Sequence, residues 1–208
     1  MKRLHGSYGA ANLSLAEAKA RLRREMRELR RRVARANPNA AVSAASHFVT
    51  WSAGVSPALR QGVIASYVAQ GGELDPTPAT LTLAGEGWVV AFPRATTREG
   101  VLTFRATGLP STHDAFGILA PPEEAALLTP DLIIVPVLAF DRHGGRLGQG
   151  AGCYDRTIAA LRASSVLSII GLAYAQQEVP RVPTEDYDQR LDGILTDTGF
   201  IEVLNPPL

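Results

Sequence analysis

The stretch Asp131-Leu-Ile-Ile-Val-Pro-Val-Leu-Ala-Phe-Asp-Arg-His-Gly-Gly-Arg-Leu-Gly-Gln-Gly-Ala-Gly-Cys-Tyr-Asp-Arg156 contains three successive elements that decide the fold. An apolar run predicts a buried strand over 132–135, a glycine-rich loop follows, and the sequence over 154–163 predicts a helix. Glycines let a backbone approach a ligand closely, and a helix N-terminus offers unpaired N–H groups at the positive end of its dipole. The stretch therefore predicts a phosphate site, to which Arg146 adds a positive charge.

The glycine loop does not match the two commonest nucleotide motifs. It lacks the Gly-Lys-Ser/Thr of a Walker A loop. It also lacks the third glycine of a dinucleotide fingerprint, because Cys153 stands where that glycine is needed. Spacing alone leaves open an ordinary glycine-rich connection between a strand and a helix.

Apolar strands alternate with helices along the rest of the chain. We expect helices over 14–36, 40–52, 78–84 and 154–163, and strands over 62–68, 88–92, 101–105, 132–135, 167–173, 194–196 and 200–203. This order predicts a three-layer α/β sandwich with a mostly parallel central sheet, Rossmann-like in class. Ligands of such sheets bind outside the carboxyl ends of the strands. Glu73, the glycine loop and the segment after 167–173 should meet at that edge.

Length and composition indicate one globular unit of 208 residues. We expect a single α/β catalytic domain over 14–208 and a mobile N-terminus over 1–13, where no periodicity is visible. No apolar run reaches the ~18 residues of a membrane span, and the start lacks the apolar core of a secretory signal. A single cysteine, Cys153, excludes an intrachain disulfide and suits the cytoplasm. The four histidines lack the spacing of a zinc site.

The first predicted helix is strongly basic. Ser14-Leu-Ala-Glu17 is a capping-box pattern, and Asn37-Pro38 predicts the end of the helix. Residues 17–35 hold nine basic and three acidic side chains, a net charge of +6, which favours an anionic partner. An apolar stripe packs this helix on the body of the protein, and at its border lie Lys19, Arg23 and Arg30.

The pattern Leu-Ala-Phe-Asp-x-x-Gly-x-Arg-Leu-Gly-x-Gly-x-Gly-x-Tyr-Asp-Arg over 138–156 resembles the signature of the 5-formyltetrahydrofolate cyclo-ligase family, also called methenyltetrahydrofolate synthetases. Three further landmarks resemble the family in the same order. These are Lys19-x-x-Leu-Arg23 with Arg30, Gly72-Glu-Leu-Asp75, and Phe116-Gly-Ile118. The resemblance covers roughly residues 15–200.

The resemblance implies an ATP- and Mg²⁺-dependent ligase that cyclises 5-formyltetrahydrofolate to 5,10-methenyltetrahydrofolate, releasing ADP and phosphate. In the family mechanism the γ-phosphoryl group passes to the formyl oxygen, N10 attacks the activated carbon, and phosphate leaves. Such a protein must align two substrates and neutralise charge that develops on phosphate. We expect a cytoplasmic monomer whose partners are 5-formyltetrahydrofolate and ATP, with neither nucleic acid nor membrane as a partner.

The resemblance also implies the residues of the ATP site. Lys19 and Arg23 would contact the phosphates from the first helix, and Arg146 with the loop backbone would hold them from the other side. The alternative for Lys19 and Arg23 is a solvated basic face. Arg30 matches a less constant basic position of the family. The loop positions expected to contact ATP are Arg146, Leu147, Gly148, Gln149, Gly150, Ala151, Gly152, Cys153 and Tyr154.

On the folate side, the resemblance makes Glu73 the carboxylate that binds the pterin, with Val68 as an apolar neighbour and Tyr154 near the reacting centre. Glu73, Arg146 and Tyr154 are thus the expected catalytic residues. Val68 could equally be a core residue of its strand.

Magnesium is expected at Asp155 and Asp192, and the weaker alternatives are Asp141 and Asp197. Two carboxylates suffice, because magnesium keeps waters and phosphate oxygens as its other ligands. Helix capping is the alternative role of Asp155.

Two positions depart from the family pattern. Members commonly carry Gly or Lys at the position of Ala151, and Tyr or Phe at that of Cys153. Cys153 removes an aromatic wall from the expected folate pocket, although a small buried thiol is the plainer interpretation. Two other classes of function remain open from the fold and charge. They are an α/β phosphosugar isomerase or transferase, and a nucleic-acid-binding protein that uses the basic helix.

Overall fold

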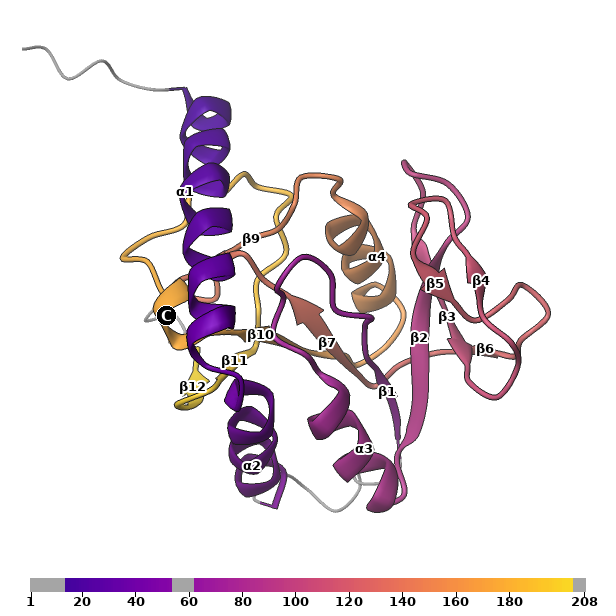
Figure 1. The fold of residues 1–208 in the computed structure, drawn as a ribbon. Coiled ribbons are helices and arrows are strands. Elements are labelled where there is room, and N and C mark those ends of the chain that lie inside the picture. The colour runs from indigo at the N-terminus through magenta and orange to yellow at the C-terminus, as the bar shows by residue number, and fades with distance from the viewer. Residues whose placement is uncertain (1–13, 54–61, 204–208) are drawn as a thin grey trace, which may run out of the picture.

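The computed structural model describes residues 14–53 and 62–203, and Figure 1 shows its layers. The N-terminus expected to be mobile, 1–13, lies outside the described residues. The helices are α1 (Leu15–Ala36), α2 (Ala40–Ala53), α3 (Thr77–Gly85) and α4 (Cys153–Arg162), with a 3₁₀ turn η2 (Ala175–Gln177).

An eight-stranded sheet forms the middle layer. Its strands are, in spatial order, β12 (Gly199–Glu202), β11 (Gly193–Thr196), β10 (Ser168–Ala173), β7 (Leu132–Pro136), β1 (Val63–Ala65), β2 (Val89–Ala95), β3 (Leu102–Ala106) and β6 (Leu127–Leu128). The five strands from β11 to β2 are parallel, and β12, β3 and β6 add antiparallel edges. The predicted α/β class with a mostly parallel sheet is confirmed.

Alternate residues of the central strands divide the core between the two faces of the sheet. Ile64 and Ile134 pack with Phe48 of α2 and Leu83 of α3 on one face. Residues of the opposite parity, such as Ala65, Ile133 and Val135, pack on the other face with Ile158 of α4. Strands buried on both faces read as continuous Val/Ile/Leu runs, which explains why the sequence signalled them clearly.

Helix α1 begins where its capping box predicts. The Ser14 hydroxyl accepts from the Glu17 N–H, and the Glu17 carboxylate accepts from the Ser14 N–H at 2.9 Å. Met26 and Val33 of the apolar stripe are buried, whereas Leu15 is 39% exposed because it lies in the first turn. Lys19 and Arg30, at the border of that stripe, are buried. Figure 1 shows α1 and α2 along one side of the molecule, opposite the ribbon of β2 and β3.

The structure departs from the sequence prediction in three segments. The expected strand over 62–68 ends at Ala65, so residues 66–70 form a loop beyond it. The glycine stretch contains a hairpin of β8 (Ala139–Phe140) and β9 (Arg146–Leu147) before it reaches α4. Two more short strands, β4 (Thr112–His113) and β5 (Leu119–Ala120), pair within the connection over 107–130.

Candidate active site

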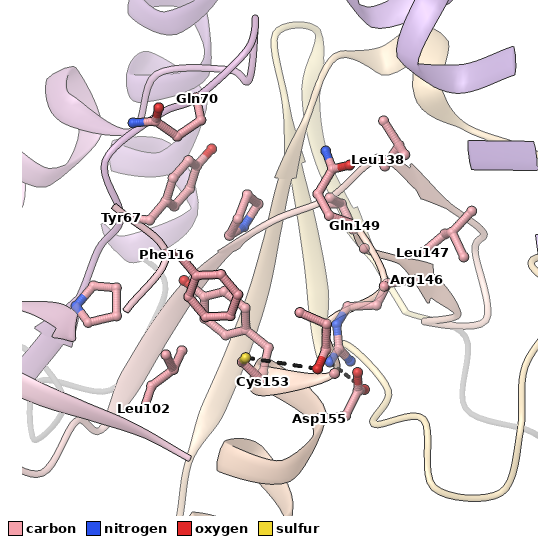
Figure 2. A pocket seen from close by; sticks show the side chains of 18 of the residues that line it. Tyr67, Gln70, Leu102, Phe116, Leu138, Arg146, Leu147, Gln149, Cys153 and Asp155 are labelled. Atoms are coloured by element: carbon pink, nitrogen blue, oxygen red, sulfur yellow. Dashed lines mark hydrogen bonds and ion pairs between the residues drawn. The ribbon is translucent and has the colours of Figure 1, made fainter. Parts of the chain in front are cut away.

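A cavity of about 940 Å³ opens at the carboxyl ends of β1 and β7. Its walls come from α1, the loop after β1, the β2–β3 ribbon, the start of α4 and the segment 185–189. Figure 2 shows Tyr67 and Phe116 on one side, Arg146 and Gln149 on the other, and Cys153 near the start of α4. The cavity brings together nearly all the site residues expected from the sequence, namely Lys19, Arg23, Val68, Glu73, Arg146, Leu147, Gly148, Gln149, Gly150, Ala151, Gly152, Cys153, Tyr154 and Asp155.

The glycine loop leads directly into the N-terminus of α4. Gly150 and Gly152 have φ angles of 107° and 67°, in the left-handed region that favours glycine. Gly152 is the N-cap residue of α4, and no described side chain caps this end of the helix. The first N–H groups of α4 therefore lie beside the cavity at the positive end of the helix dipole, as a phosphate site requires.

Two arginines of α1 hold the glycine loop in place. Arg23 Nε donates to the Gly148 carbonyl oxygen at 3.0 Å, and Arg27 Nε donates to Gln149 Oε1 at 2.9 Å. Arg23 also lines the cavity, so it is both a support of the loop and a cation at the site. Arg27 was missed by sequence reasoning, because its spacing from Arg23 placed it among the exposed arginines of the helix.

Lys19 is buried between two carboxylates. Its Nζ lies 2.6 Å from Glu185 Oε2 and 2.6 Å from Asp188 Oδ2. Burial works to lower the pKa of Lys19, but the hydrogen bonds that Lys19 donates to Asp188 and Glu185, together with their charges, outweigh it and the pKa is raised. Glu185 and Asp188 line the cavity and were missed from the sequence. Their acidic run stands between two strands of the parallel sheet, a position that could have indicated this edge.

Arg146 is the buried cation of the loop. Its Nη2 lies 2.6 Å from Asp155 Oδ1, and its Nη1 donates to the Gln189 carbonyl oxygen. Burial lowers the pKa of Arg146, and the charges of Asp155 and Asp188 oppose that effect. Because an arginine starts from a very high pKa, the guanidinium stays charged at neutral pH. Asp155 also accepts from the Gln189 N–H at 3.0 Å, so its Oδ1 fixes the position of Arg146.

Glu73 and Tyr154 both line the cavity. Burial raises the pKa of Glu73, while hydrogen bonds from the Gln70 N–H and Arg30 lower it. Burial and the charge of Glu73 raise the pKa of Tyr154, and the charge of Arg146 lowers it. Tyr154 thus lies in the field of both charges, and because its pKa is raised it keeps its phenolic proton at neutral pH.

Part of the cavity wall is apolar, and Figure 2 shows Tyr67, Leu102 and Phe116 of this part across from Arg146. This part is made by Tyr67, Val68, Pro93, Leu102, Phe116, Ile118 and Leu119. Val68 is 40% exposed, so the structure places it on the cavity wall and not in the core. Cys153 Sγ lies 3.4 Å from the Arg98 carbonyl oxygen. Burial raises the pKa of Cys153, so its sulfur is a neutral thiol at neutral pH and part of the wall.

The second expected magnesium ligand, Asp192, is not brought to the cavity. Asp192 Oδ2 accepts from the Ile169 N–H at 2.8 Å, at the amino end of β10, and from Arg162 Nη2 at 2.8 Å. Arg162 lies in the last turn of α4 and Asp155 in the first, so the two expected ligands lie near opposite ends of that helix. The hydrogen bonds of Asp192 join β10 to the C-terminal end of α4.

The two alternative magnesium ligands, Asp141 and Asp197, also accept hydrogen bonds from other parts of the fold. Asp141 accepts from the N–H groups of His143, Gly145 and Val182 at 2.8, 3.0 and 2.8 Å. Asp197 accepts from Asn37 Nδ2 and the Ala175 N–H, both at 2.8 Å. Within 14–53 and 62–203, no three potential metal ligands cluster.

The fold and the cavity define a three-layer α/β protein in which a glycine loop at a helix N-terminus and a buried carboxylate line the same cavity. The model of the 5-formyltetrahydrofolate cyclo-ligase family matches residues 15–197. The chain therefore belongs to this family, as the sequence resemblance predicted.

Curated relatives agree with this family over part of their length. The 5-formyltetrahydrofolate cyclo-ligase of Haemophilus influenzae is 39% identical over 90 residues, which are 41% of this chain and 48% of the relative. The Mycolicibacterium smegmatis enzyme of the same name is 38% identical over 74 residues, 36% of this chain and 37% of that protein. The chain thus spans about half or less of the length of these relatives.

Two solved structures share the fold. The 5,10-methenyltetrahydrofolate synthetase of Aquifex aeolicus has a TM-score of 0.70 at 23% identity, and the match covers 91% of this chain and 95% of that one. The synthetase of Mycoplasma pneumoniae has a TM-score of 0.67 at 20% identity, covering 86% and 98%. No described helix of the present chain is both long and apolar enough to cross a bilayer.

Proposed function

We propose that this protein is a cytoplasmic 5-formyltetrahydrofolate cyclo-ligase that uses ATP to form 5,10-methenyltetrahydrofolate, with release of ADP and phosphate. One observation carries the proposal: a single cavity is lined by a glycine loop with its cations, by the buried carboxylate of Glu73, and by Tyr154. A ligase that phosphorylates one substrate with another needs this juxtaposition, because both must lie in line within one site.

The glycine loop and its cations form the proposed ATP side. Lys19 offers three donors and uses two on Glu185 and Asp188, so one remains for a phosphate oxygen. Arg146 is held by Asp155 before any ligand binds, which gives a preorganised positive charge for the transferring phosphoryl group. The N–H groups at the start of α4 complete the anion site.

The apolar wall and Glu73 form the proposed folate side. A formamide oxygen is a poor leaving group, so the reaction requires phosphorylation of the formyl oxygen before N10 attacks the carbon. The Glu73 carboxylate would accept hydrogen bonds from ring N–H groups and so orient the formyl group. Tyr154, which keeps its proton, would donate a hydrogen bond to an oxygen of the transferring phosphoryl group, where negative charge must be neutralised while the formyl oxygen attacks phosphorus.

The residues of the cavity also fit magnesium. Asp155 and Asp188 both line the cavity, and both act on Arg146. Each forms its ion pair through one carboxylate oxygen, Asp188 with Lys19 and Asp155 with Arg146. The second oxygen of each carboxylate could therefore bind a cation. One or two carboxylates, with phosphate oxygens and waters, are the usual magnesium set. When bound, the ion would neutralise charge on the ATP phosphates.

The test is the appearance of methenyl product absorbance from purified protein, 5-formyltetrahydrofolate and MgATP. We expect turnover that depends on ATP and falls at least ~100-fold in Arg146→Met, because a charge stabilising the transition state is lost. Lys19→Ala should raise the KM for ATP, and Glu73→Gln should act on the folate. A matched control is Arg32→Met, an exposed site on the same helix as Lys19.

Folded protein that gives no product would refute the proposal. Salt-dependent DNA binding without turnover would favour a nucleic-acid-binding protein. Conversion of a phosphosugar without ATP would favour an isomerase or transferase of the same fold class.

A further inference from the structure

Arg30 and Glu73 form an ion pair that is buried on both sides. Arg30 Nη1 lies 3.2 Å from Glu73 Oε1, and the two side chains are only 5% and 10% exposed. Arg30 Nη2 also donates to the Gly71 carbonyl oxygen at 3.4 Å. One guanidinium thus contacts both the carboxylate and the backbone of the turn that carries it.

The remaining contacts of Glu73 leave room for a ligand. Glu73 Oε2 accepts a hydrogen bond from the Gln70 N–H at 3.0 Å, and Oε1 accepts one from Arg30. Each carboxylate oxygen thus accepts one hydrogen bond from the described residues. A carboxylate oxygen has two lone pairs, so each keeps one for a donor in the cavity. The pair therefore fixes the carboxylate without blocking it.

Arg30 differs in its surroundings from the other two basic residues of α1 that line the cavity. Lys19 contacts Glu185 and Asp188, and Arg23 contacts Gly148 of the glycine loop. Arg30 lies two to three turns further along the helix and contacts the turn over 70–73. Its hydrogen bonds join α1 to the carboxylate side of the cavity and not to the phosphate loop.

The electrostatic surroundings of Glu73 give this contact a chemical effect. The charged and titratable groups that face it are Arg30 from α1, Tyr67 from the loop after β1 and Tyr154 from α4. Both tyrosines have raised pKa values and are neutral at neutral pH. Arg30 is therefore the cation that opposes the effect of burial on this carboxylate.

We propose that Arg30 is a positioning residue of this site, which keeps Glu73 ionised and aimed into the cavity so that it can accept hydrogen bonds from the folate ring. The inference rests on the proposed function, because the ligand of Glu73 is taken from it. It assigns to Arg30 a role on the folate side in place of contact with ATP phosphates.

The test compares Arg30→Met with the wild type in the same cyclisation assay, across pH. We expect kcat/KM for 5-formyltetrahydrofolate to fall ~10–100-fold, as for the loss of a group that orients a ligand-binding side chain, with KM for ATP unchanged. The acidic limb of the profile should move about one pH unit upward, because removing a cation raises the pKa of Glu73. Arg30→Lys should restore part of both, and exposed Arg32→Met should change neither.

A double-mutant cycle with Glu73→Gln separates positioning from stability. If Arg30 acts through Glu73, Arg30→Met should cause little further loss of kcat/KM in the Glu73→Gln background. An equal loss in both backgrounds, an unmoved acidic limb, or a raised KM for ATP would overturn the inference. If Arg30→Met does not fold, Arg30→Gln, which removes the charge and keeps a polar end, takes its place. Absence of turnover in the wild type would instead refute the proposed function and leave the ion pair to a direct NMR titration of Glu73, where a charge-removing change of Arg30 that does not raise the pKa overturns the inference.

Discussion

At the scale of single residues, Asp141 shows how a carboxylate from the signature stretch can be structural. It is 1% exposed, and it accepts hydrogen bonds from three backbone N–H groups, two within its own turn and one from Val182. A buried N–H group left without a partner costs about 1–3 kcal/mol. The carboxylate of Asp141 thus stabilises the hairpin that carries Arg146.

We predict that Asp141→Ala lowers the free energy of unfolding by about 3 kcal/mol or more, because three N–H groups lose their acceptor. Urea denaturation followed by circular dichroism measures the change. Asp186→Ala, at an exposed position of the segment 185–189, should stay within about 0.5 kcal/mol of the wild type. An Asp141→Ala protein as stable as this control would show that the turn holds without the carboxylate.

At the scale of elements, the turn that carries Glu73 depends on two glycines in the left-handed region. Gly71 and Gly72 have φ angles of 55° and 82°, and a Cβ on Gly72 would lie 3.6 Å from Ala34 Cβ of α1. Space is adequate there, so the strain of a substitution would come from the backbone. A non-glycine residue in this region costs roughly 1–2 kcal/mol.

Gly72→Ala should therefore destabilise the protein by about 1–2 kcal/mol and raise the KM for 5-formyltetrahydrofolate, because relief of the strain would move Glu73. Gly85→Ala is the matched control, since Gly85 ends α3 with no atom within 4 Å of an added Cβ and no positive φ. That change should be neutral or slightly stabilising. Thermal unfolding and steady-state kinetics of both variants give the comparison, and equal behaviour would contradict the role of the turn.

Elements with local signals could be predicted from the sequence, and those that depend on distant contacts could not. The capping box at Ser14 and the apolar strands over 132–135 and 167–173 are local, and the structure has α1, β7 and β10 there. The pairing of β8 with β9 depends on where α1 and Val182 pack. Asp188 was missed because its acidic run resembles a solvated connection. The position of Asp188 depends on its ion pair with Lys19, which lies more than a hundred residues earlier in the chain.

At the scale of the whole molecule, the cavity joins segments that lie far apart in the chain. Its lining comes from α1, the loop after β1, the start of α4 and residues 185–189. A ligand that binds only the folded state stabilises it by about 2.7 kcal/mol when present at 100 times its Kd. Such a ligand should therefore stabilise this protein globally and not one element alone.

We predict that MgATP at about 100 times its Kd raises the Tm by roughly 5–10 °C, since 1 kcal/mol corresponds to about 2–4 °C for a chain of this size. Differential scanning fluorimetry measures the shift. Lys19→Ala at the same nucleotide concentration should lose most of it, while Arg32→Met keeps it. No shift in folded wild-type protein at any nucleotide concentration would count against an ATP site.

Helix α1 sets the distance between two sides of the cavity. Lys19 and Arg30 are 11 residues apart on one unbroken helix, a rise of about 16 Å. The geometry of the helix therefore fixes the distance between the proposed phosphate side and the Glu73 side of the cavity. No hinge separates the two sides within α1. One residue inserted between Lys19 and Arg30 would rotate one end by about 100° relative to the other. The distance between these residues in the chain is thus a functional dimension of the protein, as fixed as the identity of either side chain.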